Sequence, residues 1–454
     1  MLQRINPNGQ AAQGSDTRPS STSSANQHGP NIVVVGGGVA GLILATRLGD
    51  TLGRRGSARV TLIDRSWVHV WKPMLHTFAA GTWNIYQQQV HYLAHARAHH
   101  FEYVPGQVDA IDRTARRLRL APLRARNEMV APGRDVNYDV LILGFGSRAN
   151  DFGTPGVLEH CHFIDSHDEA EAFNARLRAE VVRSLAERGY IDIAIVGGGA
   201  TGVELTAELS RMVELASGYG EADVRHRLRV TLLESGPRIL GAFPENVSKS
   251  AQAELRKLGV EVRTGVKVVG ANVRGYLLET GERIPSSLKV WAAGIRASTN
   301  FDQGGLELNR VGQIVVGSDL MAKGDENIFA LGDCSTFVPE GADRPLPATA
   351  QVASQQALHL VRHLPAYLRK GKPVPPFRFH DFGALVALSE YNAFGTLGRF
   401  GFFKGGFIKG RFAQLSHAVL YRRHQLSLHG PVRAALLWLA ERINALVQPT
   451  IRMS

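Results

Sequence analysis

The sequence contains very little cysteine: Cys161 and Cys334 are its only two cysteine residues. Two isolated thiols exclude a disulfide framework, a cysteine-rich zinc or iron–sulfur site and a Cys-x-x-Cys redox pair. Thiol–disulfide exchange needs two cysteines close together, so this chemistry is disfavoured here. We expect each thiol to be a small buried side chain rather than a catalyst.

Long hydrophobic runs are also missing. No stretch approaches the roughly 18–20 apolar residues that a membrane-spanning helix needs. Residues 1–29 have few large apolar side chains and lack the apolar core of a secretory signal, so we expect a disordered tail there. The remainder belongs to a chain that is 44% hydrophobic, which is enough for folded cores.

Acidic residues are scarce at one end of the chain. Residues 361–454 contain 14 Lys and Arg but 3 Asp and Glu, whereas residues 1–360 carry a net charge of +1. This asymmetry predicts an acidic partner, either nucleic acid or anionic lipid. From Pro431 onward apolar residues recur at helical spacing, and upstream of it aromatic residues alternate with cations. Both patterns favour an amphipathic helix on an anionic membrane and no nucleic-acid partner, with a helix packed on the fold or a homodimer interface as alternatives.

The first ordered segment is typical of a nucleotide-binding unit. Residues 32–35 form a β-branched apolar run, which predicts a buried parallel strand. A Gly-x-Gly-x-x-Gly motif, a helical pattern and a second strand with an acid at its end follow. The glycines allow a tight turn, close approach to a pyrophosphate and close helix packing, and the acid can bind a ribose. The predicted cofactor-binding residues are Gly36, Gly38, Gly41 and Asp64.

The same arrangement recurs in the middle of the chain, which predicts a second nucleotide-binding unit. Its predicted cofactor-binding residues are Gly197, Gly199, Gly202 and Glu234. The spacing from Gly197 to Glu234 is longer than the usual ~20 residues, which predicts an extended helix or an inserted loop near residues 216–227. Glu234 would repel a 2′-phosphate and so favours NAD over NADP, although Arg238 close by leaves NADP open.

These motifs and a late strand that ends in Gly332-Asp333 resemble the two-dinucleotide-binding-domain flavoproteins. Within that group the chain resembles the type II NADH dehydrogenases, which are NADH:quinone oxidoreductases. Residues 198–205, residues 345–356 with their Ala-Gln-x-Ala-x-Gln pattern, and the basic C-terminal region carry this resemblance. It implies an α/β fold with two Rossmann-like domains, the NAD domain inserted in the FAD domain, and a basic amphipathic membrane-docking region. It also implies a peripheral enzyme on the cytoplasmic face of the inner membrane.

The resemblance implies roles for further residues. Glu204 would lie at the contact of nicotinamide and flavin, although a carboxylate stabilised by the helix dipole is the alternative. Gln351 and Gln355 share a helix face and would meet the quinone, or else form a solvated side of that helix. Further FAD contacts are expected at Lys72, Gly294, Asp333 and Ala350.

Histidines give weaker signals. His76 lies near Lys72 and could contact flavin, acceptor or solvent. A group at helical spacing could mimic a metal face, but no acidic segment accompanies it, so we expect a polar helix face and no metal site. This group consists of His91, His95, His99 and His100.

Together these observations predict an FAD-dependent enzyme that takes hydride from NADH and passes two electrons to a membrane quinone. The alternatives are a reductase of an electron-carrier protein and a redox-sensing flavoprotein of the apoptosis-inducing-factor type. The expected division is a tail (1–29), an FAD domain in two parts (30–160 and 293–360), an NAD(H) domain (161–292) and a C-terminal membrane and quinone region (361–454).

Overall fold

The computed structural model describes residues 29–83, 89–125, 128–217, 227–297 and 304–389, and several segments of the C-terminal region. Those segments are residues 392–397, 399–400, 403–404, 407–409 and 411–447. The expected tail and most of the loop expected near residues 216–227 lie outside the described residues.

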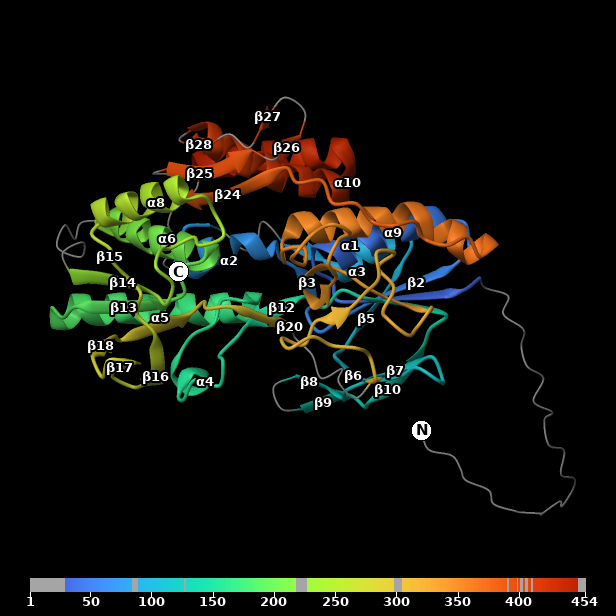
Figure 1. The fold of residues 1–454 in the computed structure, drawn as a ribbon, viewed down its shortest axis with the longest axis horizontal. Coiled ribbons are helices and arrows are strands. Elements are labelled where there is room, and N and C mark those ends of the chain that lie inside the picture. The colour runs from blue at the N-terminus through green and yellow to red at the C-terminus, as the bar shows by residue number, and fades with distance from the viewer. Residues whose placement is uncertain are drawn as a thin grey trace, which may run out of the picture.

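A five-stranded parallel sheet forms the first half of the molecule, on the right in Figure 1. Its strand order is β22-β11-β1-β2-β5, and the apolar run predicted at residues 32–35 is the buried central strand β1. These strands are β1 (Asn31–Val35), β2 (Arg59–Asp64), β5 (Glu102–Pro105), β11 (Val140–Leu143) and β22 (Ile328–Ala330). Helices α1 (Val39–Leu48) and α9 (Ala350–Lys370) pack side by side against it. Because β22 joins strands from the start of the chain, the chain leaves this sheet and later returns to it.

The intervening chain builds a second parallel sheet with the strand order β15-β14-β13-β19. Its strands are β13 (Ile191–Val196), β14 (Leu228–Glu234), β15 (Glu261–Thr264) and β19 (Leu288–Trp291). The helices of this half are α5 (His167–Glu187), α6 (Ala200–Ser217) and α8 (Glu245–Lys257). Helix α6 is longer than α1, which accounts for part of the long spacing between Gly197 and Glu234.

A two-stranded antiparallel ribbon joins the two halves. In it β12 (Ser147–Ala149) pairs with β20 (Ile295–Ala297), so the outgoing and returning chains lie side by side. The predicted α/β fold, with one dinucleotide unit inserted in the other, is confirmed.

Small antiparallel layers and short helices complete the two halves. The remaining strands are β3 (Val68–His69), β4 (Val90–His91), β6 (Val108–Asp112), β7 (Arg117–Leu120), β8 (Leu123–Ala125), β9 (Glu128–Ala131), β10 (Arg134–Asn137), β16 (Val268–Asn272), β17 (Gly275–Leu278), β18 (Arg283–Pro285), β21 (Ile314–Val315) and β23 (Ser335–Thr336). The short helices are η1 (Gly49–Gly53), η2 (Lys72–Met74), α2 (Leu75–Ala80), α3 (Tyr92–Ala98), α4 (Val157–His160) and η5 (Gly332–Cys334).

The C-terminal region lies across both halves, at the top of Figure 1. An antiparallel sheet consists of β24 (Gly383–Leu388), β25 (Asn392–Leu397) and β28 (Phe407–Lys409), beside the short pair β26 (Arg399–Phe400) and β27 (Phe403–Lys404). The final helix, α10 (Arg411–Val447), is broken at Gly430 (φ 72°, ψ 173°), before Pro431.

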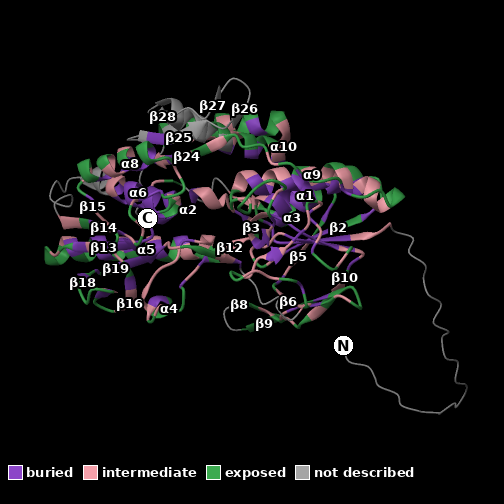
Figure 2. Ribbon diagram, viewed as in Figure 1, coloured by how far each residue is buried: buried purple, intermediate pink, exposed green. Residues whose placement is uncertain are grey.

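Side chains tie the two halves of α10 together. Trp438 Nε1 donates to Gln425 Oε1 at 2.7 Å, and Gln425 Nε2 donates to Glu441 Oε1 at 3.1 Å. The helix therefore folds back as a hairpin. Much of its second half is exposed (Figure 2). None of the described helices is both long enough and apolar enough to cross a membrane.

Candidate active site

The two glycine motifs adopt the same backbone geometry. Gly36 (φ +98°) and Gly197 (φ +114°) occupy conformations that residues with a side chain rarely adopt. A Cβ atom at Gly41 would lie 1.9 Å from the carbonyl oxygen of Gly36, and one at Gly202 would lie 2.0 Å from that of Gly197. The first and third glycines of each motif are therefore required by the turn and by the contact of helix with strand.

In both units the acid at the end of the next strand holds the residue between the first and second glycines of the motif. Asp64 Oδ2 accepts from the backbone N–H of Gly37 at 2.6 Å, and Glu234 Oε2 accepts from that of Gly198 at 2.6 Å. Burial raises the pKa of Asp64. The sequence predicted both acids as ribose ligands, and the structure places each one beside its glycine turn.

The second glycine of each motif faces open space. Gly38 and Gly199 are exposed, and a Cβ atom on either would meet nothing within 4 Å. Gly38 is the N-cap of α1 and, as a glycine, has no side chain to cap the helix. A helix N-terminus beside a carboxylate suits a dinucleotide, because its N–H groups attract phosphate while the carboxylate accepts ribose hydroxyls. Both motifs fit such a ligand.

Additional side chains fix the first motif. The Gly37 carbonyl accepts from the Tyr92 hydroxyl at 2.7 Å and from His69 Nδ1 at 2.9 Å. His69 Nε2 lies 3.0 Å from His424 Nε2 on α10. Burial lowers the pKa of His69 to about 4 and that of His424 well below its usual value, so both rings are neutral at pH 7. The sequence analysis missed His69 and Tyr92, because no motif marks a residue that acts through a backbone carbonyl.

Three expected flavin contacts lie near β12. Lys72 Nζ donates to the Ser147 carbonyl at 2.8 Å, and the Ser147 hydroxyl donates to Asp333 Oδ2 at 2.7 Å. Ser147, which sequence reasoning missed, therefore connects Lys72 to Asp333. Gly294 precedes β20 with φ +62°, and a Cβ atom there would clash with Phe152.

The N-terminus of α9 carries the Ala-Gln-x-Ala-x-Gln pattern. Ala350 is its first residue, and the Thr349 side chain caps it by accepting from the Val352 N–H at 3.3 Å. Gln351 and Gln355 share a face of the helix, as predicted. Each amide bonds both ways with the backbone of residues 380–383, at 2.8–3.1 Å. Both glutamines thus hold the segment that leads into β24.

Glu204 lies near the far end of that strand. Its Oε1 accepts from the Ala387 N–H of β24 at 3.1 Å, and its Oε2 lies 3.6 Å from His76 Nδ1. Burial, reinforced by Glu208 one turn further along α6, raises the pKa of Glu204 to about 8. Strand β24 therefore connects the glutamines of α9 with Glu204 of α6, a link that sequence reasoning missed.

The two cysteines are separate thiols, as expected. Cys334 is fully buried, and burial raises its pKa to about 12. Cys161 is half-buried and its pKa is raised for the same reason. A thiol held protonated is a poor nucleophile, so neither residue is suited to thiol chemistry.

The prediction of a polar helix face at residues 91–100 is wrong. Helix α3 ends at Ala98, and His95 within it is buried, with its Nε2 2.8 Å from the Thr46 hydroxyl. His99 caps the helix and pairs with Asp50 at 3.0 Å. Within the described ranges, no group of three or more His, Cys, Asp or Glu residues could hold a metal ion.

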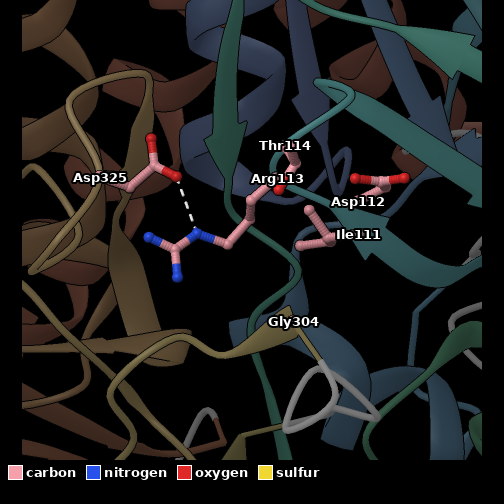
Figure 3. A pocket seen from close by; sticks show the side chains of 6 residues that line it. All are labelled: Ile111, Asp112, Arg113, Thr114, Gly304 and Asp325. Atoms are coloured by element: carbon pink, nitrogen blue, oxygen red, sulfur yellow. Dashed lines mark hydrogen bonds and ion pairs between the residues drawn. The ribbon is translucent and has the colours of Figure 1, made fainter.

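A surface pocket lies beside β6, and Arg113 bonds Asp325 at 2.8 Å within it (Figure 3). None of its lining residues belongs to either glycine motif. The residues that line it are Ile111, Asp112, Arg113, Thr114, Gly304 and Asp325.

Comparison with known proteins shows which enzyme family shares this architecture. Residues 30–357 match the family model described as pyridine nucleotide-disulphide oxidoreductase, so the chain is a member of that class of two-dinucleotide enzymes. It is 38% identical over 93% of its length to the type II NADH:quinone oxidoreductase of Haemophilus influenzae, covering 99% of that protein. A Staphylococcus aureus protein of the same name is 30% identical over 81% of the chain and 89% of its own length. The chain belongs to the type II NADH:quinone oxidoreductase family.

Solved structures share the fold. NDH2 from Plasmodium falciparum, in complex with NADH, superposes with a TM-score of 0.78 at 17% identity, covering 93% of this chain and all of that one. The sulfide:quinone oxidoreductase of Aquifex aeolicus gives a TM-score of 0.70 at 16% identity, covering 92% and 95% of the two chains.

Proposed function

We propose that this chain oxidises NADH through bound FAD and passes the two electrons to a quinone. Family membership carries this proposal: the relative that matches 93% of the chain is named for this reaction. The two cysteines, which form no disulfide with each other, support it as well, since their raised pKa values disfavour a disulfide or sulfide substrate. The flavin, when bound, accepts hydride and releases electrons to the acceptor.

The first unit would hold FAD. Its glycine turn and the N-terminus of α1 would receive the pyrophosphate, while Asp64 would bind the adenosine ribose. Asp333 and Lys72, which the backbone and hydroxyl of Ser147 connect, would meet the flavin end together with Gly294 and with Ala350 at the start of α9. The N-terminus of α9 would stabilise negative charge on a flavin bound there.

The second unit would bind NADH. Glu234 accepts backbone hydrogen bonds from Gly198 and Gly236 and would repel a 2′-phosphate. Arg238 donates to the carbonyls of Leu240 and Gly241, at 3.1 and 2.9 Å, so its guanidinium is already engaged with its own loop. Both observations support NADH over NADPH.

The quinone site would lie where α9, β24 and α6 meet. Gln351 and Gln355 hold the segment before β24, and Glu204 holds its far part. We assign the two glutamines to shaping this site and Glu204 to proton exchange beside the nicotinamide.

The second half of α10 would dock on an anionic membrane, on the cytoplasmic face of the inner membrane, as a peripheral attachment. Its exposed apolar residues follow helical spacing, and exposed Arg433 and Arg442 lie among them in the sequence. The apolar residues are Val432, Leu436, Leu439, Ile443, Leu446 and Val447. A homodimer that covers this face is the competing arrangement. We retain the division into residues 30–160, 161–292, 293–360 and 361–454.

The test is turnover by the purified yellow holoenzyme. NADH should bleach the flavin absorbance, and a water-soluble quinone should restore it, whereas a disulfide should not. Protein without flavin, or flavin that NADH cannot reduce, would refute the function. Removal of residues 431–454 should abolish sedimentation with anionic vesicles; sedimentation that persists would refute the docking assignment.

A further inference from the structure

Phe152 is an exposed aromatic residue in a backbone conformation that a bulky side chain rarely adopts. It follows β12 at the ribbon between the two halves of the molecule (Figure 1), is 63% exposed and has φ at +51°. Such a conformation is strained for a residue with a Cβ atom, and strained residues concentrate at functional sites. Glycine would adopt the same turn without strain, so the aromatic ring needs a reason other than the turn.

Neighbouring side chains hold this turn in place. The side-chain oxygen of Asn150 accepts from the Phe152 N–H at 3.0 Å, and the Asn150 carbonyl accepts from Trp291 Nε1 at 2.8 Å. Asp151 is buried, and its Oδ1 lies 3.2 Å from Arg296 Nη2 on the returning strand β20. The turn is therefore anchored to β19 and β20, and these contacts sustain its strain.

The Phe152 ring lies against the loop that follows β19. A Cβ atom at Gly294 would be 2.5 Å from Cζ of Phe152, so the tip of the ring already packs on this glycine. The same loop lies against the second glycine turn, because a Cβ atom at Gly197 would be 2.6 Å from the Ala292 carbonyl oxygen. Gly294 and Ile295 are both exposed. Phe152 is therefore separated from the glycine turn of the second unit by a single loop.

The strand order indicates which half of a dinucleotide would reach this loop. In the order β15-β14-β13-β19, the strands that follow β13 in the chain lie on opposite sides of it, and dinucleotides bind across the carboxyl ends of strands at such a point. Glu234 at the end of β14 marks the adenosine side, and the N-terminus of α6 would receive the pyrophosphate. Beyond the pyrophosphate the ligand would reach the end of β19, so its nicotinamide half would lie beside Gly294.

We propose that Phe152 is a substrate-binding residue whose ring contacts the nicotinamide half of NADH. The ring offers an apolar face to the flat, uncharged dihydronicotinamide and its ribose. Gly294 permits the approach because no side chain stands between ring and ligand. A glycine at position 152 would relieve the strain and remove this contact, so the residue gives up stability for substrate binding. The inference rests on the proposed binding of NADH by the second unit.

The test compares Phe152→Gly with Phe152→Tyr in the FAD-loaded holoenzyme. We expect Phe152→Gly to raise the KM for NADH about tenfold, because partial burial of an aromatic side chain against the ligand is lost. The kcat at saturating NADH and the flavin content should stay unchanged. Phe152→Tyr keeps the ring and should keep the KM of the wild type. An unchanged KM in Phe152→Gly, or an equal rise in Phe152→Tyr, would overturn the inference.

Melting temperatures separate this role from a structural one. Phe152→Gly should melt no lower than the wild type, because relief of the strained backbone offsets the greater freedom of glycine in the unfolded chain. A lower melting temperature with an unchanged KM would show that the ring serves the fold instead. Tyr190→Ala is the matched control, since this residue is also 60% exposed but precedes β13, at the opposite end of the strands. It should leave the KM for NADH unchanged.

Inhibition by ADP shows which half of NADH the ring meets. ADP contains the adenosine and pyrophosphate part of NADH but lacks the nicotinamide and its ribose. Its inhibition constant against NADH should therefore be the same in the wild type and in Phe152→Gly. Weakening of ADP by the same factor as NADH would refute the assignment to the nicotinamide half. Wild-type flavin that NADH cannot reduce would instead refute the proposed function.

Discussion

The two dinucleotide units have nearly superposable motifs but different support. In both, the first glycine has positive φ and the third lies against the carbonyl of the first. An acid accepts from the N–H of the residue after the first glycine. In the first unit the Gly37 carbonyl also accepts from Tyr92 and His69, and His69 leads on to α10. In the second, the Gly198 carbonyl accepts from the backbone of Leu240 nearby.

This difference matches the two ligands that the units would bind. The turn proposed to bind FAD is fixed by side chains from three separate segments, which would suit a cofactor that stays through every turnover. The turn proposed to bind NADH is fixed by its own acid and its own loop, which would suit a substrate that must enter and leave. The same glycine motif can therefore either retain its ligand or let it exchange, depending on the side chains that pack behind the turn.

The largest expected effects come from paired substitutions of the third glycines. Either Gly41→Ala or Gly202→Ala drives a Cβ atom into a backbone oxygen, a strain of at least about 1–3 kcal/mol. Gly41→Ala should give protein without flavin absorbance. Gly202→Ala should keep FAD but raise the KM for NADH at least about tenfold. Equal flavin loss in both would remove the distinction between the units.

The second prediction concerns acid. His69 and His95 have pKa values of about 4 and 3, below the 6.5 of an unfolded histidine. Between those values the unfolded chain binds more protons, so stability is full above pH 6.5 and falls as the pH drops toward 4. At about 1.4 kcal/mol per pH unit and histidine, pH 5 costs about 2 kcal/mol for each. Thermal unfolding of the holoenzyme against pH measures this, and a flat melting temperature from pH 7 to 5 would contradict it.

A smaller effect is expected for His69→Phe, which removes the bonds to Gly37 and His424. A lost buried hydrogen bond costs about 1–3 kcal/mol, so FAD should dissociate at least about fivefold more readily while the KM for NADH is unchanged. Titration of apoprotein with FAD checks this, with the exposed His91→Phe as control. Unaltered FAD affinity would show that the hydrogen bonds of His69 are not needed to hold the glycine turn of the first unit for FAD binding.

The smallest effect is expected for Glu234→Gln. Its amide can still accept one of the hydrogen bonds from Gly198 and Gly236, and loss of the other costs about 1 kcal/mol, or about fivefold in the KM for NADH. Discrimination against NADPH should weaken because the negative charge is gone. Flavin content should be unaffected; the matching Asp64→Asn variant should instead weaken FAD binding.

Local patterns in the sequence predicted the two sheets, the glycine turns and the acids at the strand ends. Each of these depends on residues close together in the chain, where spacing reports geometry. Spacing also placed Gln351 and Gln355 on one face of a helix. Their partners, the backbone groups of residues 380–383, could not be predicted because that segment has no period of its own.

Long-range packing explains the remaining gaps. His95 looked like part of a polar face, but its partner Thr46 lies on another helix, and no local pattern encodes that contact. The same holds for His76, whose neighbour Glu204 is distant in sequence. Burial of a polar side chain is decided by the tertiary partner that satisfies it, and one sequence does not name that partner.

The ribbon of β12 and β20 has an engineering consequence. Since Ser147 pairs with Ala297 and Ala149 with Ile295, the inserted unit begins and ends at neighbouring points. The inserted unit could therefore be replaced at this one place. A short turn or another nucleotide-binding domain would connect β12 to β20, and the first sheet would keep its strand order. Such an exchange would also replace α6, which packs on β24, so the contacts between the inserted unit and the C-terminal sheet would have to be rebuilt.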